Sequence, residues 1–535
     1  MSRVCHGAKC AEAVPGKTLF DYADDLAVHV PTSCDRAGTC HECVVEVRRG
    51  IEALSPPSDA ESFLKDAYRL ACQAIVQETT CDVEFVPLRR RPQILTATSG
   101  KTPELDPAVT RRGYQVFYQD EPLDTFRGHM YGVAVDAGTT TVVIELTDLE
   151  TGRSVYVSSF ENPQRFGGSD VMHRISYDSG PFRGELHKSI INGLNHELKQ
   201  MCRRLGFDRH EIYELVVAGN PTMRELFFGR DVQSIGQKPY RSEIEHEFRA
   251  GTRENTTLLE KAHRLGIWAH PQGRVYGAPF IASHVGADTA AALVAIDVEA
   301  LHETFLLVDV GTNTEVVLGH AGRLVCASGP AGPAFEGGLV RYGMPGVDGA
   351  IESIRWDGDR FEYKTIGGGP PEGLCGSGLI DLLAELRRSG RMSARGVFPG
   401  GAREILIAPE SGIVFSREDA SNLAQAKSAN YCAQYLLLRE CGVSPSDVDR
   451  LYLAGGFANY VNVANALAIG FLPPVPGERI IKVGNASLEG AKHLLLSRRK
   501  RRAIEHLTRK IEHVELETVP DFFEVFVEGC LFQPM

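Results

Sequence analysis

Apolar residues are distributed differently on the two sides of residue 130, and their spacing predicts a small domain followed by a larger unit. In the first part, short alternating runs predict strands at 43–47 and 82–86, and the pattern after Thr18 predicts a helix over 18–28. Residues 88–128 contain four prolines and an arginine run at 89–91, a composition that suits a linker. We therefore expect an α+β domain over residues 1–87, joined by a linker over 88–128 to the rest of the chain.

From residue 131 the sequence becomes rich in apolar β-branched residues, and one pattern occurs twice. Residues 132–146 and 305–318 each predict a buried strand, a tight turn and a second strand. The matching positions are Asp136 with Asp309, Gly138 with Gly311, Thr139 with Thr312, and Thr141 with Thr314. An internal duplication explains these matches better than chance does. We therefore expect two related α/β lobes, over residues 129–300 and 301–535.

The two turns have the chemistry of phosphate-binding loops. Glycine lets the backbone approach a phosphate closely, while threonine hydroxyls and unpaired N–H groups donate to its oxygens. An aspartate at the end of the preceding strand can hold Mg²⁺, directly or through water, or orient an attacking water. One such turn is also a plain β-turn, whereas two in register would clamp a triphosphate. The candidate ATP-binding residues are Gly138, Thr139, Thr140, Gly311, Thr312 and Asn313, with Asp136 and Asp309 as candidate catalytic and Mg²⁺-binding residues.

A third apolar strand, at 449–454, ends in Gly455 and Gly456 and is followed by a small-residue helical pattern to Ala468. Two adjacent glycines remove side chains where the flat base of a nucleotide could lie. The alternative is a strand-to-helix turn that uses glycines for packing. Because both phosphate loops are present in the same chain, we assign Gly455 and Gly456 to ATP binding.

Four cysteines in the first domain have the spacing of iron–sulfur ligands. Cys34, Cys40 and Cys43 fall within one loop, and Cys72 follows at a distance. This layout suits a [2Fe-2S] cluster, and its first gap is one residue longer than in plant-type ferredoxins, so the loop is more similar to the adrenodoxin-like branch. The alternative is a structural zinc site, but such sites prefer two close cysteine pairs. His41 is expected to be a solvated neighbour of the cluster.

Composition narrows the class of protein. The chain has 535 residues, 43% hydrophobic and 24% charged, which is the balance of a globular protein with several domains. Nine of its 13 cysteines lie outside the cluster motif and are scattered, which favours a reducing cytoplasm over a disulfide framework. Cys5 and Cys10 are therefore expected to be free thiols, with extra cluster ligands as the alternative.

Charge and the lengths of apolar runs exclude some partners. A net charge of −12 gives no reason to expect nucleic acid, and the basic run at 498–502 is expected to be the solvated end of a helix. No basic start followed by an apolar stretch resembles a signal peptide, and no apolar run is long enough to span a bilayer. We therefore expect a cytoplasmic protein without a membrane partner.

The two phosphate loops and the double-glycine turn, in this order, resemble the superfamily of acetate and sugar kinases, Hsp70 and actin (ASKHA). Its members bind ATP and Mg²⁺ between two related lobes. With a ferredoxin motif ahead of these loops, the chain is similar to the reductive activators of corrinoid-dependent proteins. Further stretches that carry this resemblance lie at 161–164, 218–223, 285–289, 331–338 and 374–381.

The resemblance implies a β-grasp ferredoxin-like domain followed by a duplicated actin-like ATPase fold. It implies a [2Fe-2S] cluster, ATP and Mg²⁺ as cofactors. The implied activity is ATP-dependent transfer of an electron to an inactive Co(II) corrinoid protein of a methyltransferase system, which regenerates Co(I). An external low-potential reductant would reload the cluster, and a homodimer is an option. The chain departs from the family pattern in its short stretch before Asp136 and in the cluster loop, at Asp35, Arg36, His41 and Glu42.

Two other functions compete with this one. The chain could deliver electrons to a different low-potential enzyme, as the activators of radical dehydratases do, but those hold a [4Fe-4S] cluster across a dimer. It could also be an electron carrier whose nucleotide module does not hydrolyse ATP, although both phosphate loops keep their aspartate and glycine. A plain sugar or acetate kinase would have no use for a ferredoxin module.

Several residues have alternative roles that the sequence leaves open. The loop at 328–338 is either a docking surface for the corrinoid protein or a tight connection within the second lobe, and Glu336 in it contacts either the nucleotide or solvent. Lys427, in a predicted helix over 419–438, is expected on the surface, with a nucleotide contact as the alternative. Asn220, Asp288 and Ser377 lie in the resembling stretches without a role that their chemistry alone reveals.

Overall fold

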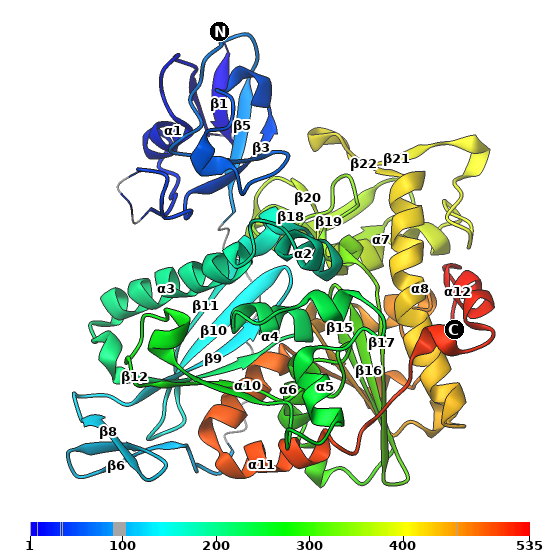
Figure 1. Cartoon of the computed structure of the whole chain (residues 1–535). Coiled ribbons are helices and arrows are strands. Elements are labelled where there is room, and N and C mark those ends of the chain that lie inside the picture. Colours follow the sequence, from blue (N-terminus) through cyan, green and yellow to red (C-terminus); the bar gives the residue numbers. More distant parts are fainter. Residues whose placement is uncertain (1, 8, 33, 35, 89–102, 457) are drawn as a thin grey trace.

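The computed structural model describes residues 2–7, 9–32, 34, 36–88, 103–456 and 458–535. Figure 1 shows a small N-terminal module, in blue, that lies against helices α2 and α3 of a much larger body. The body contains two large sheets with helices between and around them. The arginine run at 89–91 and most of the first half of the predicted linker lie outside the described residues.

The N-terminal module is a five-stranded sheet in the order β2-β1-β5-β3-β4 with one α-helix. Its strands are β1 (Arg3–His6), β2 (Lys9–Glu12), β3 (Val44–Arg49), β4 (Tyr68–Leu70) and β5 (Val83–Pro87), and its helix is α1 (Leu19–Asp25). The helix predicted after Thr18 forms, and Thr18 caps it: its side chain accepts from the Asp21 N–H while the Asp21 carboxylate accepts from the Thr18 N–H. The helix ends earlier than predicted, since Ala27 has a left-handed backbone with φ of 51°.

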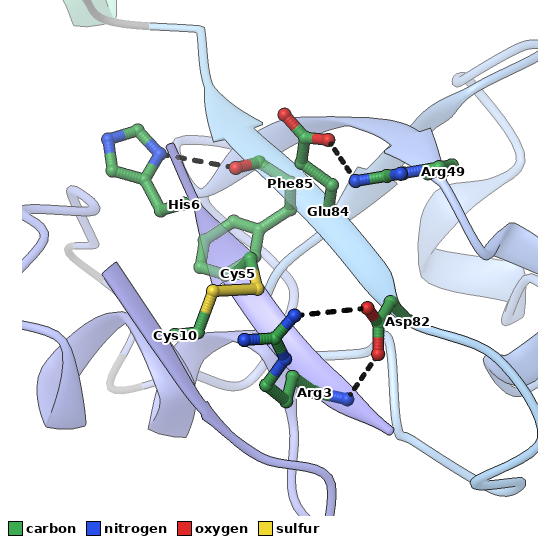
Figure 2. Close-up of a disulfide and its surroundings, with 8 residues drawn as sticks. All are labelled: Arg3, Cys5, His6, Cys10, Arg49, Asp82, Glu84 and Phe85. Carbon is green, nitrogen blue, oxygen red and sulfur yellow. Dashed lines mark hydrogen bonds and ion pairs between the residues drawn. A yellow bond between two sulfur atoms is a disulfide. The ribbon is translucent and has the colours of Figure 1, made fainter. Parts of the chain in front are cut away.

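Cys5 and Cys10 form a disulfide, so the prediction of free thiols at these positions is wrong. The two residues face each other across the antiparallel β1–β2 pair, with a Cα–Cα distance of 4.1 Å. Figure 2 shows the disulfide on this hairpin, next to the Phe85 ring of β5. The strand register that opposes the two thiols comes from the fold of the hairpin, and scattered cysteine positions do not reveal it.

Part of the predicted linker has its own structure. Residues 109–125 form a three-stranded antiparallel sheet of β6 (Val109–Arg112), β7 (Gln115–Tyr118) and β8 (Glu121–Thr125). Val109 and Val116 are fully buried in the core of the first lobe. The prolines that suggested a flexible segment are compatible with this sheet because Pro122 lies on its edge strand. The domain boundaries themselves stay predictions.

The two large sheets of the body share the topology of five of their six strands, and the sixth strand, β13 or β25, adds at opposite edges. The first has the order β11-β10-β9-β12-β14-β13 and the second has the order β24-β23-β15-β16-β17-β25. In each, three consecutive strands pair antiparallel, and the next two strands, β12 and β14 or β23 and β24, add in parallel on the other side of the first. The shared strand order confirms the duplicated α/β fold that the sequence repeat predicted.

The strands of the first sheet are β9 (Tyr131–Ala137), β10 (Thr141–Asp148), β11 (Ser154–Glu161), β12 (Ile212–Ala218), β13 (Leu258–Lys261) and β14 (Arg274–Gly277). The strands of the second are β15 (Phe305–Val310), β16 (Thr314–His320), β17 (Arg323–Gly329), β23 (Arg450–Ala454), β24 (Ile480–Gly484) and β25 (Glu512–His513). Smaller sheets in the second half use β18 (Ala350–Trp356), β19 (Phe361–Thr365), β20 (Gly373–Leu374), β21 (Glu404–Ala408) and β22 (Ile413–Ser416).

The helices of the body cover these sheets or lie between them. Those before residue 300 are α2 (Val171–Asp178), α3 (Glu185–Leu205), α4 (Pro221–Phe227), α5 (Glu243–Arg249) and α6 (Ala287–Ala295). The later ones are α7 (Gly376–Arg388), α8 (Arg417–Glu440), α9 (Val463–Ala468), α10 (Ala486–Leu496), α11 (Arg498–Leu507) and α12 (Phe522–Gly529). None of the helices in the described part of the chain combines the length and apolar character that a membrane crossing needs.

Helices α6 and α10 join the two sheets into one core. Both belong to a buried cluster that also contains Leu215 of the first sheet and Leu307 of the second. The helices touch at Gly490, where a Cβ atom would lie 1.8 Å from the carbonyl oxygen of Ala291. The C-terminal segment 486–507 therefore packs partly on the first lobe, although it follows the second lobe in the sequence.

The prediction that the basic run at 498–502 is solvated is wrong for two of its residues. Lys500 and Arg501 of α11 are buried at 7% and 6% exposure. The Arg501 guanidinium pairs with Glu214 of β12 at 2.8 Å, and Lys500 Nζ pairs with Asp297 at 2.8 Å. Buried charges need such partners, because an unpaired charge in the interior is strongly unfavourable. The run therefore attaches α11 to the first lobe.

Lys427 lies neither on the surface, as predicted, nor at the nucleotide site, which was the alternative. Its helix forms as α8, but its side chain is fully buried, away from solvent and absent from the lining of the nucleotide cleft described below. Its Nζ donates to the carbonyl oxygens of Ile469 at 3.0 Å and Leu531 at 2.8 Å. Lys427 thus ties α8 to the C-terminal segment and to the residues that follow α9.

Candidate functional site

The two sheets bring the predicted phosphate loops to the same cleft, which has a volume of about 140 Å³. The first loop joins β9 to β10, and the second joins β15 to β16. All the residues assigned to ATP and Mg²⁺ line this cleft: Asp136, Gly138, Thr139, Thr140, Asp309, Gly311, Thr312, Asn313, Gly455 and Gly456. The duplicated topology explains this convergence, since each loop follows the first strand of its sheet.

Glycine is required by the local geometry at two of these positions. Gly455 has φ of 117°, and a Cβ there would lie 2.1 Å from the carbonyl oxygen of Val310. A Cβ at Gly138 would lie 2.4 Å from the carbonyl oxygen of Thr141. The third motif therefore lies directly against β15 of the second phosphate loop, which a larger residue at 455 would prevent.

Glu336 joins the two loops. Its carboxylate accepts a hydrogen bond from Thr140 Oγ1 of the first loop at 2.7 Å and another from Thr312 Oγ1 of the second. The two threonine hydroxyls are 3.4 Å apart. Of the alternatives for the loop at 328–338, its Glu336 end faces the cleft, on the short helix η8 (Pro333–Glu336).

Five carboxylates surround the cleft: Asp136, Asp288, Asp309, Glu315 and Glu336. Burial raises the pKa of Asp309 to about 8, helped by the negative charges of Asp288 and Asp136. Burial also raises the pKa of Asp288 to about 7, although a backbone hydrogen bond from Thr289 opposes it. No lysine, arginine or histidine is among the described residues that line the cleft. The raised pKa values show that ionising these carboxylates together is unfavourable, and a bound cation would stabilise their ionised forms.

Asp136 is oriented by α10. Its carboxylate accepts from Asn485 Nδ2 and Ser487 Oγ, both at 2.8 Å, and burial raises its pKa in spite of these bonds. Asn485 is the N-cap of α10. Sequence analysis missed both partners, because they lie about 350 positions away and precede an ordinary helix.

Two residues whose roles were open also reach this site. Asn220 donates from Nδ2 to Thr139 Oγ1 at 2.9 Å and caps α4. Asp288 lies at the start of α6 with its carboxylate in the cleft. The family-like stretches at 218–223 and 285–289 contained the signal for both, since a polar residue follows an apolar strand or opens a buried helix there.

A second, more apolar pocket of about 90 Å³ adjoins the cleft and shares Thr140, Glu336 and Gly456 with it. Its other walls include Phe335, Met344, Ile366, Cys375, Ser377 and Tyr460. Ser377 at the start of α7 donates from its hydroxyl to the carbonyl oxygen of Glu352 at 2.7 Å. The combination of an apolar wall and an adjoining polar cleft suits a ligand with a flat ring and a charged tail.

The four predicted cluster ligands lie in two pairs. Cys43 Sγ and Cys72 Sγ are 3.4 Å apart, while Cys34 Sγ and Cys40 Sγ lie 3.9 and 4.0 Å from the same hydroxyl, Thr32 Oγ1. In the described residues, no group of three or more cysteine, histidine or carboxylate side chains is arranged around a single metal ion. Two pairs suit a [2Fe-2S] cluster, in which each iron takes two protein ligands.

One thiol of each pair has a lowered pKa. A hydrogen bond from Cys43 lowers the pKa of Cys72 to about 6 and correspondingly raises that of Cys43. For Cys34, burial is outweighed by hydrogen bonds from Cys40 and Thr39, which lower the pKa to about 6. Since the thiolate is the form that binds metal, the chemistry of this donor set fits iron.

His41 is not the solvated neighbour that was predicted. Its ring stacks on Phe63 with centroids 4.0 Å apart, and its Nδ1 lies 2.9 Å from the Glu185 carboxylate of α3. The cluster loop is therefore in contact with the first lobe.

Three family models match successive segments of the chain. Residues 4–77 match the family model of a 2Fe-2S iron-sulfur cluster binding domain, residues 131–301 that of the RACo middle region, and residues 303–535 that of the C-terminal domain of RACo, the ASKHA domain. The N-terminal module is thus a [2Fe-2S] ferredoxin-like domain and the body has an ASKHA fold.

Three relatives cover most of the chain. The corrinoid activation enzyme RamQ of Eubacterium limosum is 32% identical over 430 residues, which are 75% of this chain and 70% of that protein. The [Co(II) methylated amine-specific corrinoid protein] reductase of Methanosarcina barkeri is 25% identical over 74% of this chain and 75% of its own. A solved structure of a reductive activator for corrinoid, iron-sulfur protein superposes with a TM-score of 0.73 at 28% identity, covering 100% of this chain and 99% of that one. The chain therefore belongs to the family of reductive activators of corrinoid proteins.

Proposed function

We propose that this protein is an ATP-dependent reductase that delivers one electron from its [2Fe-2S] cluster to a Co(II) corrinoid protein and so regenerates the Co(I) form. The observation that carries this proposal is the joining, in one chain, of a paired cysteine ligand set to a cleft between two phosphate loops. The named activities of the relatives support the choice of acceptor. The corrinoid protein would belong to a methyltransferase system, and an external low-potential reductant would reload the cluster.

The cleft and its neighbouring pocket would bind different parts of one nucleotide. In this proposal the N–H groups of Gly138, Thr139 and Thr140 and of the second loop bind the phosphates. The apolar pocket beside Gly456, with the Tyr460 and Phe335 rings in its wall, takes the adenine base. The two sites adjoin at Thr140 and Glu336, as a continuous ligand requires.

A bound Mg²⁺ would balance the negative charge that the carboxylates and the triphosphate bring to the site. In their ionised forms the buried carboxylates would repel a triphosphate that arrives without a cation, because the described lining residues include no basic side chain to offset the charge. A cation would also favour ionisation of the carboxylates whose pKa values are raised. Magnesium is commonly held by one or two carboxylates together with phosphate oxygens and waters. Asp136 and Asp309 are our candidates to hold it, directly or through water, and to orient the water that attacks the γ-phosphate, and Asp288 is a third carboxylate within the same cleft.

Cys34, Cys40, Cys43 and Cys72 would hold the cluster, which supplies the transferable electron. Plant-type [2Fe-2S] centres have potentials near about −400 mV, above that of the Co(II)/Co(I) couple. For a one-electron transfer, each shortfall of about 59 mV costs about a factor of ten in equilibrium. ATP can overcome this only by binding one conformation of the complex better than the other, and closure of two lobes around a nucleotide offers such a pair of states.

The test is an anaerobic reduction assay. The cluster-loaded protein is reduced and mixed with a Co(II) corrinoid protein, and the Co(I) absorption band is followed with and without Mg·ATP. We expect the band to grow only with Mg·ATP. Growth at the same rate without nucleotide would contradict ATP dependence. Lack of Co(I) with several corrinoid proteins, despite a reducible cluster and bound ATP, would favour another low-potential acceptor.

Two variants separate the parts of this proposal. Cys72→Ser should lose the visible absorption of the cluster and the electron transfer but keep nucleotide binding, because Cys72 is remote from the cleft lining. Asp309→Asn should keep the cluster spectrum and lose ATP-dependent reduction. If Asp309→Asn bound Mg·ATP and reduced cobalt at the rate of the parent, the assignment of this carboxylate would be wrong.

A further inference from the structure

The ferredoxin-like module is seated on one face of the first lobe, made by the short helix η3 (Pro163–Gly167) and by α2 and α3 (Figure 1). On this face Phe63 of the module packs edge-on against Phe166, with ring centroids 5.5 Å apart. Tyr177 of α2 donates its hydroxyl to the carbonyl oxygen of Phe63 at 2.5 Å. Phe63, Phe166 and Tyr177 are all at most 4% exposed, so the contact is an apolar core shared by the two units.

A polar contact along α3 lies beside this apolar one. Asn192 Nδ2 donates to the carbonyl oxygen of Cys40 at 3.3 Å, and Glu185 pairs with His41 at 2.9 Å. The ring of His196 lies 5.3 Å from that of His29. Residues 185, 192 and 196 are spaced by about two turns and one turn of a helix, so they share one side of α3. The cluster loop itself is thus part of the docked surface.

The same segment that holds the module also holds the first phosphate loop. Arg174 of α2 donates from its guanidinium to the carbonyl oxygen of Thr139 at 2.7 Å. Asn162, just before η3, donates from Nδ2 to the carbonyl oxygen of Gly138 at 2.8 Å and from its backbone N–H to that of Thr140, also at 2.8 Å. Both side chains are at most 1% exposed. Three successive carbonyl groups of the loop are therefore held by residues 162 and 174.

The position of these bonds has a chemical consequence. The peptide units whose carbonyls accept from the Asn162 side chain and from Arg174 carry the N–H groups of Thr139 and Thr140, two of those proposed above to bind phosphate. An anion bound to those N–H groups polarises the same peptide units and makes their carbonyl oxygens better acceptors. Phosphate in the cleft should therefore strengthen the bonds from Asn162 and Arg174 and hold η3 and α2 more firmly.

We propose that residues 161–178 couple the nucleotide cleft to the docking of the ferredoxin-like module, so that bound nucleotide holds the module more tightly on the η3–α2–α3 face. The chain of contacts runs from Thr139 through Arg174 and α2 to Tyr177, and from there to Phe63 and His41. This inference rests on the proposed binding of nucleotide between the two phosphate loops. It assigns a role to the Glu161–Asn162–Pro163–Gln164 stretch, which the nucleotide chemistry alone does not explain.

Coupling between two binding events is reciprocal, so it can be measured from either side. In the cluster-loaded full-length protein, amide hydrogen exchange of residues 60–65 and 171–178 is compared with and without Mg·ADP, and the affinity for Mg·ADP is measured by calorimetry. We expect slower exchange in both segments when nucleotide is bound. Tyr177→Phe, which removes only the hydroxyl that holds Phe63, should weaken nucleotide binding by about fivefold, the lower end of typical coupling factors.

Two further variants complete the design. Asn192→Ala loosens the module from α3 without touching α2, and it should weaken nucleotide binding in the same direction. Tyr213→Phe is the matched control, since Tyr213 is a buried tyrosine of the first lobe whose hydroxyl faces Asp124, 3.4 Å away, outside both the cleft and the docked face. It should bind nucleotide like the parent.

The outcomes distinguish this inference from the function on which it rests. Nucleotide binding without any change in exchange of residues 60–65, together with parental affinity in Tyr177→Phe and Asn192→Ala, would overturn the coupling alone. If the parent bound no Mg·ADP or Mg·ATP, the proposed function and the coupling would both be wrong. An equal loss of affinity in Tyr213→Phe would show general destabilisation of the lobe and would also overturn the coupling.

Discussion

The contact between helices α6 and α10 at Gly490 gives a sharp test of how the fold is held together. Gly490 lies within α10, where replacement by alanine would by helix propensity alone stabilise the helix by about 1 kcal/mol. Packing predicts the opposite effect. The new Cβ would lie 1.8 Å from the carbonyl oxygen and 2.3 Å from the carbonyl carbon of Ala291, and backbone atoms of α6 cannot rotate away.

Helices α6 and α10 would have to separate by more than about 1 Å to accept the methyl group, and both lie in the core that joins the two sheets. Overpacking of this kind typically costs about 1–3 kcal/mol, and the rigid backbone contact places Gly490→Ala at the upper end. We expect a net loss of about 2 kcal/mol. For the roughly 400 residues of the body, with an unfolding entropy of about 2.1 cal/mol/K per residue, that lowers the melting temperature by about 2 °C.

The assay is thermal unfolding of the full-length protein, with the visible absorption of the cluster followed as a separate signal for the N-terminal module. Gly490→Ala should lower the unfolding temperature of the body and, because Asn485 and Ser487 at the start of α10 hold Asp136, weaken nucleotide binding. The control is Gly477→Ala, where no atom lies within 4 Å of the new Cβ. A Gly490→Ala protein that melts at or above the parental temperature would refute the close-packing argument.

Three further predictions concern single side chains. Glu61 is buried and accepts from Arg69, from the Ser58 hydroxyl and from the N–H groups of Ser58 and Leu70. Burial opposes its ionisation, but these hydrogen bonds together outweigh burial and lower its pKa. The ionised Glu61 therefore stabilises the folded module fully above the ordinary glutamate pKa of about 4.3, and this stabilisation is lost as the pH falls below that value. At pH 7 the Glu61→Gln protein should lose its cluster faster than the parent, and near pH 4 the ratio of the two rates should be smaller. The rate of cluster loss is measured by bleaching of the visible absorption. Cys10→Ser should leave the cluster spectrum intact and cost at most about 2 kcal/mol in thermal unfolding, because the disulfide closes a very short loop; loss of the cluster would show that the disulfide has a larger role. Lys427→Met should destabilise the body by about 3 kcal/mol, because the carbonyl oxygens of residues 469 and 531 each lose a charged donor in the interior and, among the described residues, only the second keeps another, the Gln533 N–H; unchanged thermal unfolding would contradict this.

Local patterns in the sequence predicted several of the elements and the loop residues that line the cleft. The helix that starts after Thr18, the two strand–turn–strand repeats and the double-glycine turn are all signals within about fifteen residues, where periodicity and turn chemistry dominate. The match of Asp136 with Asp309 predicted two related lobes, and the shared strand order confirms it. The cysteine spacing predicted a [2Fe-2S] domain, which the family comparison confirms.

Only the tertiary structure decided which distant residues meet. Asn485 and Ser487 reach Asp136 because α10 returns to the first lobe, and Cys5 meets Cys10 because of the hairpin register. Lys427, Arg501 and His41 were expected near solvent because charged and polar side chains usually lie there, and each is instead taken up by partners from remote segments. A polar side chain can be buried wherever the fold supplies hydrogen-bond or charge partners for it. Those partners come from remote segments, so no local pattern in the sequence shows where they will lie.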